Sequence, residues 1–199
     1  MNATYLFQKP FCEFHSSESY WSAFFALFLL NETRAPVPRR LPIWRYTEPD
    51  KYRLSDELDL RDITLDGLVV EGSLCGRPFN LPSWPMEYNS LKVDVVLIRG
   101  RRLTLIETKT IGASIARNLL LYLAVAEHLR TQGWQAEVYH LISYGHETEN
   151  DWKLISQHQL QLLFWEDVFR LASSTPLGHM LGVDLNEYAD LPRASERAT

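Results

Sequence analysis

Residues 93–110, VDVVLIRGRRLTLIETKT, constrain the fold more than any other stretch of the chain. Valine, leucine, isoleucine and threonine on both sides of a glycine-containing turn are typical of a buried β-hairpin. Gly100 in the first position of a two-residue loop, followed by Arg101, predicts a type II′ turn. That turn places Arg99 opposite Arg102 and thereby fixes the register of both strands.

The same hairpin contains three charged residues, Asp94, Glu107 and Lys109. The register places Asp94 opposite Glu107 in a non-hydrogen-bonded pair, where Cα atoms approach to about 4.5 Å. Two like charges in such a pair destabilise a sheet, and Lys109 projects from the same face as Glu107. A self-neutralising ion cluster at a sheet edge is one interpretation. Because one lysine does not balance two carboxylates, we favour a site for Mg²⁺ or Mn²⁺, which bind hard oxygen ligands.

The remaining patterns predict an α/β fold with a central mixed β-sheet flanked by helices. Prolines at four positions in 33–50 predict an irregular excursion there, and 76–90 reads as a loop. The other expected elements are a helix at 16–32, strands within 51–75, a helix at 113–131 closed by Gly133, a strand at 134–145, a polar loop at 146–153, and a short strand plus a helix within 154–173.

The length of 199 residues suits one domain. We expect a single domain over 1–199 whose core comprises about 13–32 and 52–173. The proline-rich excursion at 33–50 and a polar tail at 184–199 lie outside that core.

The overall composition predicts a soluble, cytoplasmic protein. The formal net charge of −5 argues against a generally basic nucleic-acid coat protein, although a local basic patch can still bind phosphates. Cys12 and Cys75 are isolated from each other, which favours a reducing compartment. The most apolar run, 20–30, is too short to span a bilayer, no secretory leader is evident, and the six histidines show no metal-ligand spacing.

Asp94, followed after twelve residues by Glu107-Thr108-Lys109, resembles the signature of the PD-(D/E)XK nuclease superfamily. The resemblance covers roughly residues 84–145 and implies a restriction-endonuclease-like core. Within the superfamily, DVVLIRGRRLTLIETKT looks most like the nuclease half of the CRISPR-associated effectors activated by cyclic oligoadenylate. The chain has no room for their sensor domain, and proline does not precede Asp94.

The resemblance implies a metal-dependent nuclease acting on DNA, with RNA as the alternative. Asp94, Glu107 and Lys109 would be catalytic. Asp94 and Glu107 would hold Mg²⁺ or Mn²⁺, helped by the backbone carbonyl of Thr108. A further metal-binding glutamate is expected from the first helix, and Glu18 is the first candidate. The weaker candidates are Glu13 and Glu87, and a helix-terminal charge is the alternative role for Glu18.

The predicted helix after the hairpin offers Ser114, Arg117, Asn118 and Tyr122 on one face. Arg117 and Asn118 would bind nucleic acid, whereas Tyr122 is more often a core residue. Arg39, Arg40 and Arg45 lie near Trp44 and Tyr46, which suits either nucleic-acid contact or a solvated surface with anchoring aromatics.

Two other functions stay open at this stage. The chain can be a catalytically silent nuclease-fold module that binds nucleic acid or assembles with a partner protein. It can also be one subunit of a larger machine, or a homodimer, with Trp21, Trp44 and Trp84 at the interface. We expect no membrane partner.

Overall fold

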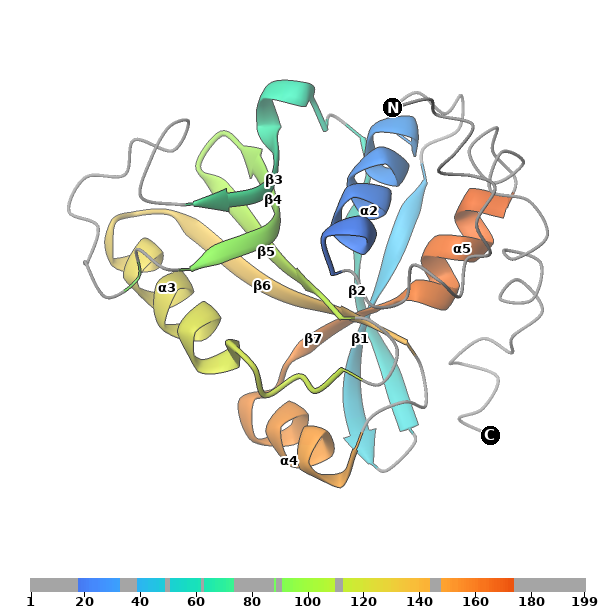
Figure 1. Ribbon diagram of the computed structural model, residues 1–199. Coiled ribbons are helices and arrows are strands. Elements are labelled where there is room, and N and C mark those ends of the chain that lie inside the picture. Colours follow the sequence, from blue (N-terminus) through green and yellow to red (C-terminus); the bar gives the residue numbers. More distant parts are fainter. Residues whose placement is uncertain are drawn as a thin grey trace.

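The structure is a computed structural model that describes residues 18–32, 39–48, 51–61, 63–73, 88, 91–109, 113–143 and 148–173. One mixed sheet of seven strands organises these residues, in the order β2-β1-β7-β6-β5-β4-β3 (Figure 1). The elements in chain order are α2 (Glu18–Glu32), β1 (Arg40–Glu48), β2 (Lys51–Asp59), the 3₁₀ turn η2 (Leu65–Gly67), β3 (Leu68–Ser73), β4 (Lys92–Arg99), β5 (Arg102–Thr108), α3 (Leu119–Thr131), β6 (Gln135–Ile142), α4 (Glu149–His158), β7 (Gln161–Phe164) and α5 (Trp165–Ser173).

Helices cover both faces of the sheet, as the sequence predicts (Figure 1). Val95, Leu97 and Ile106 point to the face covered by α2 and α5 and form one core cluster with them. Leu103 and Leu105 point to the opposite face and pack against α3. The alternation along β4 and β5 therefore explains why both strands are apolar almost throughout.

The hairpin register is confirmed over the paired residues. Arg99 pairs with Arg102, and pairing continues inward to Val95↔Ile106. Gly100 has a φ of +59° whereas Arg101 is outside the positive-φ region, which fits the expected type II′ turn.

The prediction for residues 33–50 is wrong for residues 40–48. β1 occupies Arg40–Glu48 and lies inside the sheet, between β2 and β7. Pro42 is accommodated because β7 pairs with β1 only at Trp44 and Arg45. One side of the strand has no sheet partner at Pro42 among the described residues, and a proline is tolerated at such a position.

The start of the helix predicted at 113–131 also differs. Residues 115–118 form a turn and α3 begins at Leu119. Asn118 has a φ of 65°, which is incompatible with a continuing right-handed helix. Gly133, with a φ of +82°, follows the end of α3 as predicted.

The polar stretch at 146–153 contains the beginning of α4, so the predicted loop is wrong from residue 149 onward. Thr148 and Asp151 form a capping box, in which each side chain accepts a hydrogen bond from the other residue's backbone N–H. The strand and the helix expected within 154–173 are present as β7 and α5.

Two of the three tryptophans considered for a partner interface belong to the core. Trp21 is 2% exposed and Trp44 is 6% exposed, so neither offers a surface to a partner. Trp84, the tail at 184–199, Glu13 and Glu87 lie outside the described residues. Among the described residues, none of the helices is long and apolar enough to cross a membrane.

Gly100→Ala should lower the free energy of unfolding by about 1 kcal/mol, because an L side chain is strained at this φ. This loss of stability would come from backbone strain alone, because no other atom lies within 4 Å of the added Cβ. Chemical denaturation measures it, with Gly100→Asn as the control because asparagine tolerates positive φ. Equal losses for the two variants would contradict the assigned turn.

Candidate active site at the fork between two strands

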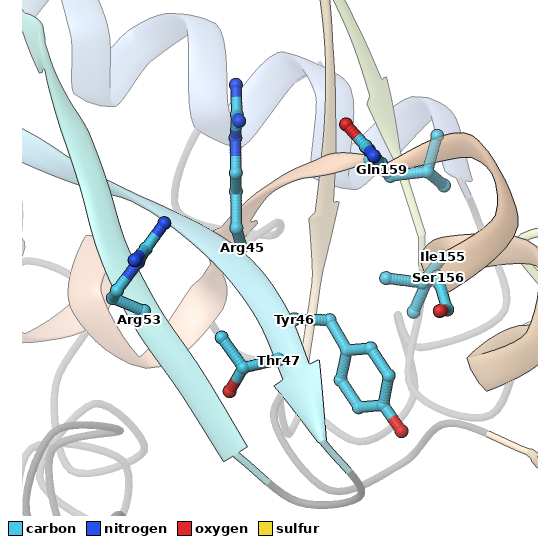
Figure 2. Close-up of a pocket in the computed structure, with 8 residues that line it drawn as sticks. Arg45, Tyr46, Thr47, Arg53, Ile155, Ser156 and Gln159 are labelled. Carbon is cyan, nitrogen blue, oxygen red and sulfur yellow. The ribbon is translucent and has the colours of Figure 1, made fainter.

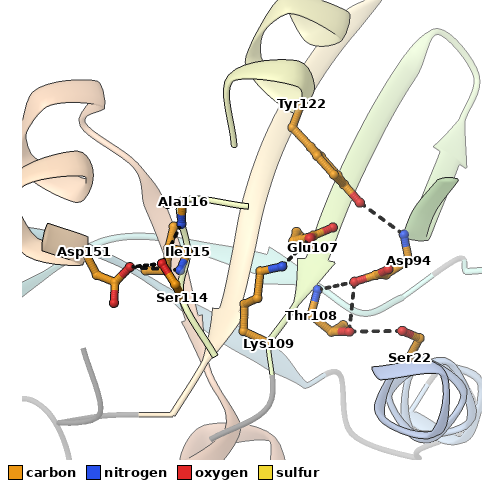
Figure 3. A network of polar contacts seen from close by, with 10 residues as sticks. All are labelled: Ser22, Asp94, Glu107, Thr108, Lys109, Ser114, Ile115, Ala116, Tyr122 and Asp151. Atoms are coloured by element: carbon orange, nitrogen blue, oxygen red, sulfur yellow. Dashed lines mark hydrogen bonds and ion pairs between the residues drawn. The ribbon is translucent and has the colours of Figure 1, made fainter. Parts of the chain in front are cut away.

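The candidate site lies where β4 and β5 separate (Figure 3). Regular pairing ends at Val95↔Ile106. A continued ladder would join the N–H of Thr108 to the carbonyl of Val93. This N–H instead donates to Oδ2 of Asp94 at 2.8 Å. The Asp94 carboxylate thus replaces a strand partner at the fork.

Helices on both faces of the sheet contribute to the position of Asp94. The Thr108 hydroxyl donates to the same Asp94 oxygen at 3.0 Å, and it also contacts the Ser22 hydroxyl of α2 at 3.0 Å. From the other face, the Tyr122 hydroxyl of α3 accepts the backbone N–H of Asp94 at 3.2 Å. Because Ser22, Thr108 and Tyr122 are all buried, the carboxylate is held rigidly.

Glu107 and Lys109 form a buried ion pair beside Asp94. Lys109 Nζ donates to Glu107 Oε1 at 2.5 Å, and the two side chains are 2% and 5% exposed. The backbone of Lys109 is fixed on both sides of the residue. Its N–H donates to the carbonyl of Leu141 at 2.8 Å, and its carbonyl accepts from Nε1 of Trp165 at 2.9 Å.

The pKa of Asp94 is raised to about 7, first by burial and then by the charge of Glu107. The hydrogen bonds from Thr108 and the charge of Lys109 lower it but do not outweigh these two causes. Burial, followed by the charges of Glu107 and Asp94, also raises the pKa of Tyr122, which therefore stays neutral. When Asp94 and Glu107 are both ionised, Lys109 balances only one of the two negative charges.

His140 is a residue of the site that the sequence did not single out. It pairs with Glu107 across β5 and β6, so both side chains leave the sheet on the same face. The imidazole is buried, and neither ring nitrogen has a hydrogen-bond partner among the described residues. Burial, and secondarily the charge of Lys109, lowers the pKa of His140 to about 3, so the ring is neutral at physiological pH.

The other predicted site residues do not join this network. Arg117 and Asn118 are exposed, and within the described part of the chain neither forms an ion pair or hydrogen bond with the acidic residues at the fork. Ser114 donates to Asp151 of α4 at 2.9 Å, so the expected helical face that it shares with Tyr122 is wrong. Glu18 is the first residue of α2, but its side chain lies outside the described residues.

Asp151 ties the segment before α3 to the start of α4 (Figure 3). Its carboxylate accepts from the Ser114 hydroxyl and the Ile115 N–H, and also from both the N–H and the hydroxyl of Thr148. Burial raises the pKa of Asp151, but these hydrogen bonds outweigh it and hold the pKa below its usual value. Asp151 is therefore a structural carboxylate, in contrast to Asp94.

The residues at the fork fit a divalent cation. Oδ1 of Asp94 has no hydrogen-bond partner among the described residues, and Glu107 is close enough to raise the Asp94 pKa. No group of three or more histidine, cysteine, aspartate or glutamate side chains with ligand geometry occurs within the described ranges. Two carboxylates are nevertheless sufficient for Mg²⁺, which keeps several waters and substrate oxygens in its coordination shell.

No family model, curated protein or solved structure matches this chain. The functional argument therefore depends on the residues and their geometry.

Asp94→Asn should stabilise the metal-free protein at pH 8 by about 1–4 kcal/mol and have little effect at pH 4. A folded-state pKa of about 7 lies above the unfolded value of roughly 3.9. The favourable contribution of the protonated carboxyl is thus complete below about pH 4 and is lost as the pH rises through 7. Thermal unfolding without metal between pH 4 and pH 8 measures the difference.

Asp66→Asn is the matched control, because Asp66 is exposed. A pH-independent effect of Asp94→Asn would contradict the raised pKa.

Proposed function

We propose that the chain is a metal-dependent nuclease that hydrolyses phosphodiester bonds of DNA, with RNA as the alternative substrate. The observation that supports this function is the arrangement at the fork, where two carboxylates and a buried lysine lie on strand ends and Asp94 has a raised pKa. A carboxylate whose pKa is perturbed by burial and a neighbouring charge is characteristic of functional sites. The resemblance of this segment to PD-(D/E)XK nucleases points to the same reaction.

The chain's own residues would have distinct roles. Asp94 and Glu107 would hold Mg²⁺ or Mn²⁺, which when bound acidifies water and offsets charge on the phosphate. Thr108 would orient Asp94 through its N–H and hydroxyl, and its carbonyl is the proposed further ligand. Lys109, whose Nζ donates to Glu107, would also donate to the attacking water and hold it in line with phosphorus.

The reaction itself requires little covalent chemistry from the chain. A water oxygen adds to phosphorus and gives up a proton to solvent. The bond from phosphorus to one strand oxygen breaks, and that oxygen leaves with a proton taken from solvent. Lys109 would supply positive charge near the phosphate as negative charge develops. Glu18 from α2 is proposed as an additional metal ligand, and Arg117 and Asn118 as contacts to the nucleic acid.

Purified protein should cleave nucleic acid with Mg²⁺ or Mn²⁺, and Glu107→Gln or Lys109→Ala should each lower the rate by at least about 100-fold. A panel of double-stranded DNA, single-stranded DNA and RNA measures the rates and identifies the substrate. Glu127→Gln and Lys153→Ala are the matched controls, since both residues are exposed on α3 and α4. Cleavage that persists in chelator and in Glu107→Gln would refute the mechanism.

A catalytically silent module that binds nucleic acid or a protein partner is the second candidate. Two observations favour it: the net charge of −5 and the engagement of Lys109 with Glu107 in a buried ion pair. A cytoplasmic location suits both candidates, because the two cysteines are isolated in the sequence.

Binding of Mn²⁺ separates the two candidates. For a nuclease, Mn²⁺ should raise the melting temperature of the wild type, because a ligand that binds only the folded state stabilises it. The increase should disappear in Asp94→Asn and remain in Asp66→Asn. A wild-type melting temperature that does not respond to Mn²⁺ would favour the silent module.

A further inference from the structure

A polar pocket lies between β1, β2 and the end of α4 (Figure 2). Its volume is about 310 Å³, and its lining contains two arginines and no acidic residue. The polar lining residues are Arg45, Tyr46, Thr47, Arg53, Ser156 and Gln159. The pocket therefore has a positive charge without a carboxylate in its wall.

The two arginines oppose each other directly. Arg45 pairs with Arg53 across β1 and β2, and Figure 2 shows both side chains leaving their strands in the same direction. Opposed residues have Cβ atoms about 4.5–5.5 Å apart, and like charges in this arrangement destabilise a sheet. An anion between them would remove that repulsion.

Neighbouring arginines are neutralised by acids, whereas this pair is not. Arg39 forms an ion pair with Glu32, and Arg40 forms one with Glu57. Arg45 and Arg53 form no ion pair within the described residues. Of the three arginines at 39, 40 and 45, the first two are therefore paired with acids, and Arg45 lines the pocket.

Neutral donors complete the pocket. The side chains of Ser156 and Gln159 form no hydrogen bond within the described part of the chain, so the hydroxyl and the amide are available to a ligand. Gln159 has a left-handed backbone, with φ 49°, at the end of α4. The two guanidinium groups are the strongest phosphate donors of the lining, and the hydroxyl and the amide add neutral donors elsewhere in the wall.

An aromatic pair lies on the other side of β1 from the Arg45 side chain, because neighbouring residues of a strand face opposite ways (Figure 2). Tyr46 lines the pocket, is partly exposed and stacks on Trp152 with ring centroids 4.8 Å apart. Sites for single-stranded nucleic acid combine phosphate-binding cations with aromatic rings on which bases stack. These rings lie across β1 from the arginines, so a nucleic-acid strand is taken as the source of the phosphate because the proposed nuclease acts on one.

We propose that this pocket binds a backbone phosphate of single-stranded nucleic acid through Arg45 and Arg53. β1 is three strand positions from β5 in the sheet, so the pocket is about 14 Å from the fork across the strands. It is a second contact point for the strand and not part of the candidate metal site. Its phosphate chemistry is independent of the proposed nuclease, whereas its assignment to a nucleic-acid strand rests on that function.

The test measures binding without cleavage. A labelled single-stranded oligonucleotide is titrated in chelator against the wild type and against Arg45→Gln/Arg53→Gln. The affinity should fall about tenfold, and the slope of log affinity against log salt should decrease by about 0.7 per lost phosphate contact. Because no metal is present, an inactive nuclease would leave this result unchanged.

Arg101→Gln/Arg102→Gln is the matched control, since it removes the same charge from exposed positions at the β4–β5 turn. This variant should retain near-wild-type affinity. Arg45→Lys/Arg53→Lys keeps the charge but loses the planar fork of the guanidinium, so it should bind with intermediate affinity. Equal losses in the two glutamine double variants would overturn the pocket as a specific contact.

Thermal unfolding with inorganic phosphate and with a mononucleotide gives an independent readout. Without ligand, Arg45→Gln/Arg53→Gln should melt at or above the wild-type temperature, because it removes a repulsive pair. Either phosphate compound should stabilise only the wild type. Suppose a phosphate compound raises the melting temperature of the wild type but not of the variant, while both proteins bind the oligonucleotide equally. The pocket would then bind phosphate, but a nucleic-acid strand would be overturned as its source. Shifts that are equal in both proteins would overturn the site itself.

Discussion

The separation of β4 from β5 is the constraint on which the rest of the site depends. Two antiparallel strands that diverge leave buried backbone groups without partners, and this is costly unless another group replaces them. Asp94 supplies that replacement, because its carboxylate accepts the N–H that Val93 would otherwise accept. A single carboxylate therefore ends the pairing and stays at the point where the sheet opens. The helices on both faces then contact the residues around it.

Local chemistry explains which elements were predictable. Gly100 fixed the turn and hence the register, since few residues tolerate its φ. The start of α3 was not predictable, because it depends on Asp151 holding Ser114 and Ile115 from a distant helix. β1 was missed because Pro42 argues against a central strand, and its tolerance depends on how far the short β7 reaches.

The same distinction applies to the candidate site. Asp94, Glu107 and Lys109 were recognisable because charges within apolar strands require an explanation. His140 carried no such signal, since its position beside Glu107 follows from the parallel register of β5 and β6. Ser22 is an ordinary small polar residue until α2 lies on the sheet. Site residues that come from distant elements can be recognised only from a structure, whereas those within one hairpin can be recognised from the sequence.

The indole of Trp165 connects α5 to the lysine of the site. Trp165 is the first residue of α5, donates to the carbonyl of Lys109, and packs in an aromatic cluster with Trp21 and Phe169. Changes in that cluster can therefore reposition the Lys109 backbone without touching a charged residue. Any shortened version of the protein must retain α5 to preserve the site, although the helix contributes no side chain to the proposed chemistry.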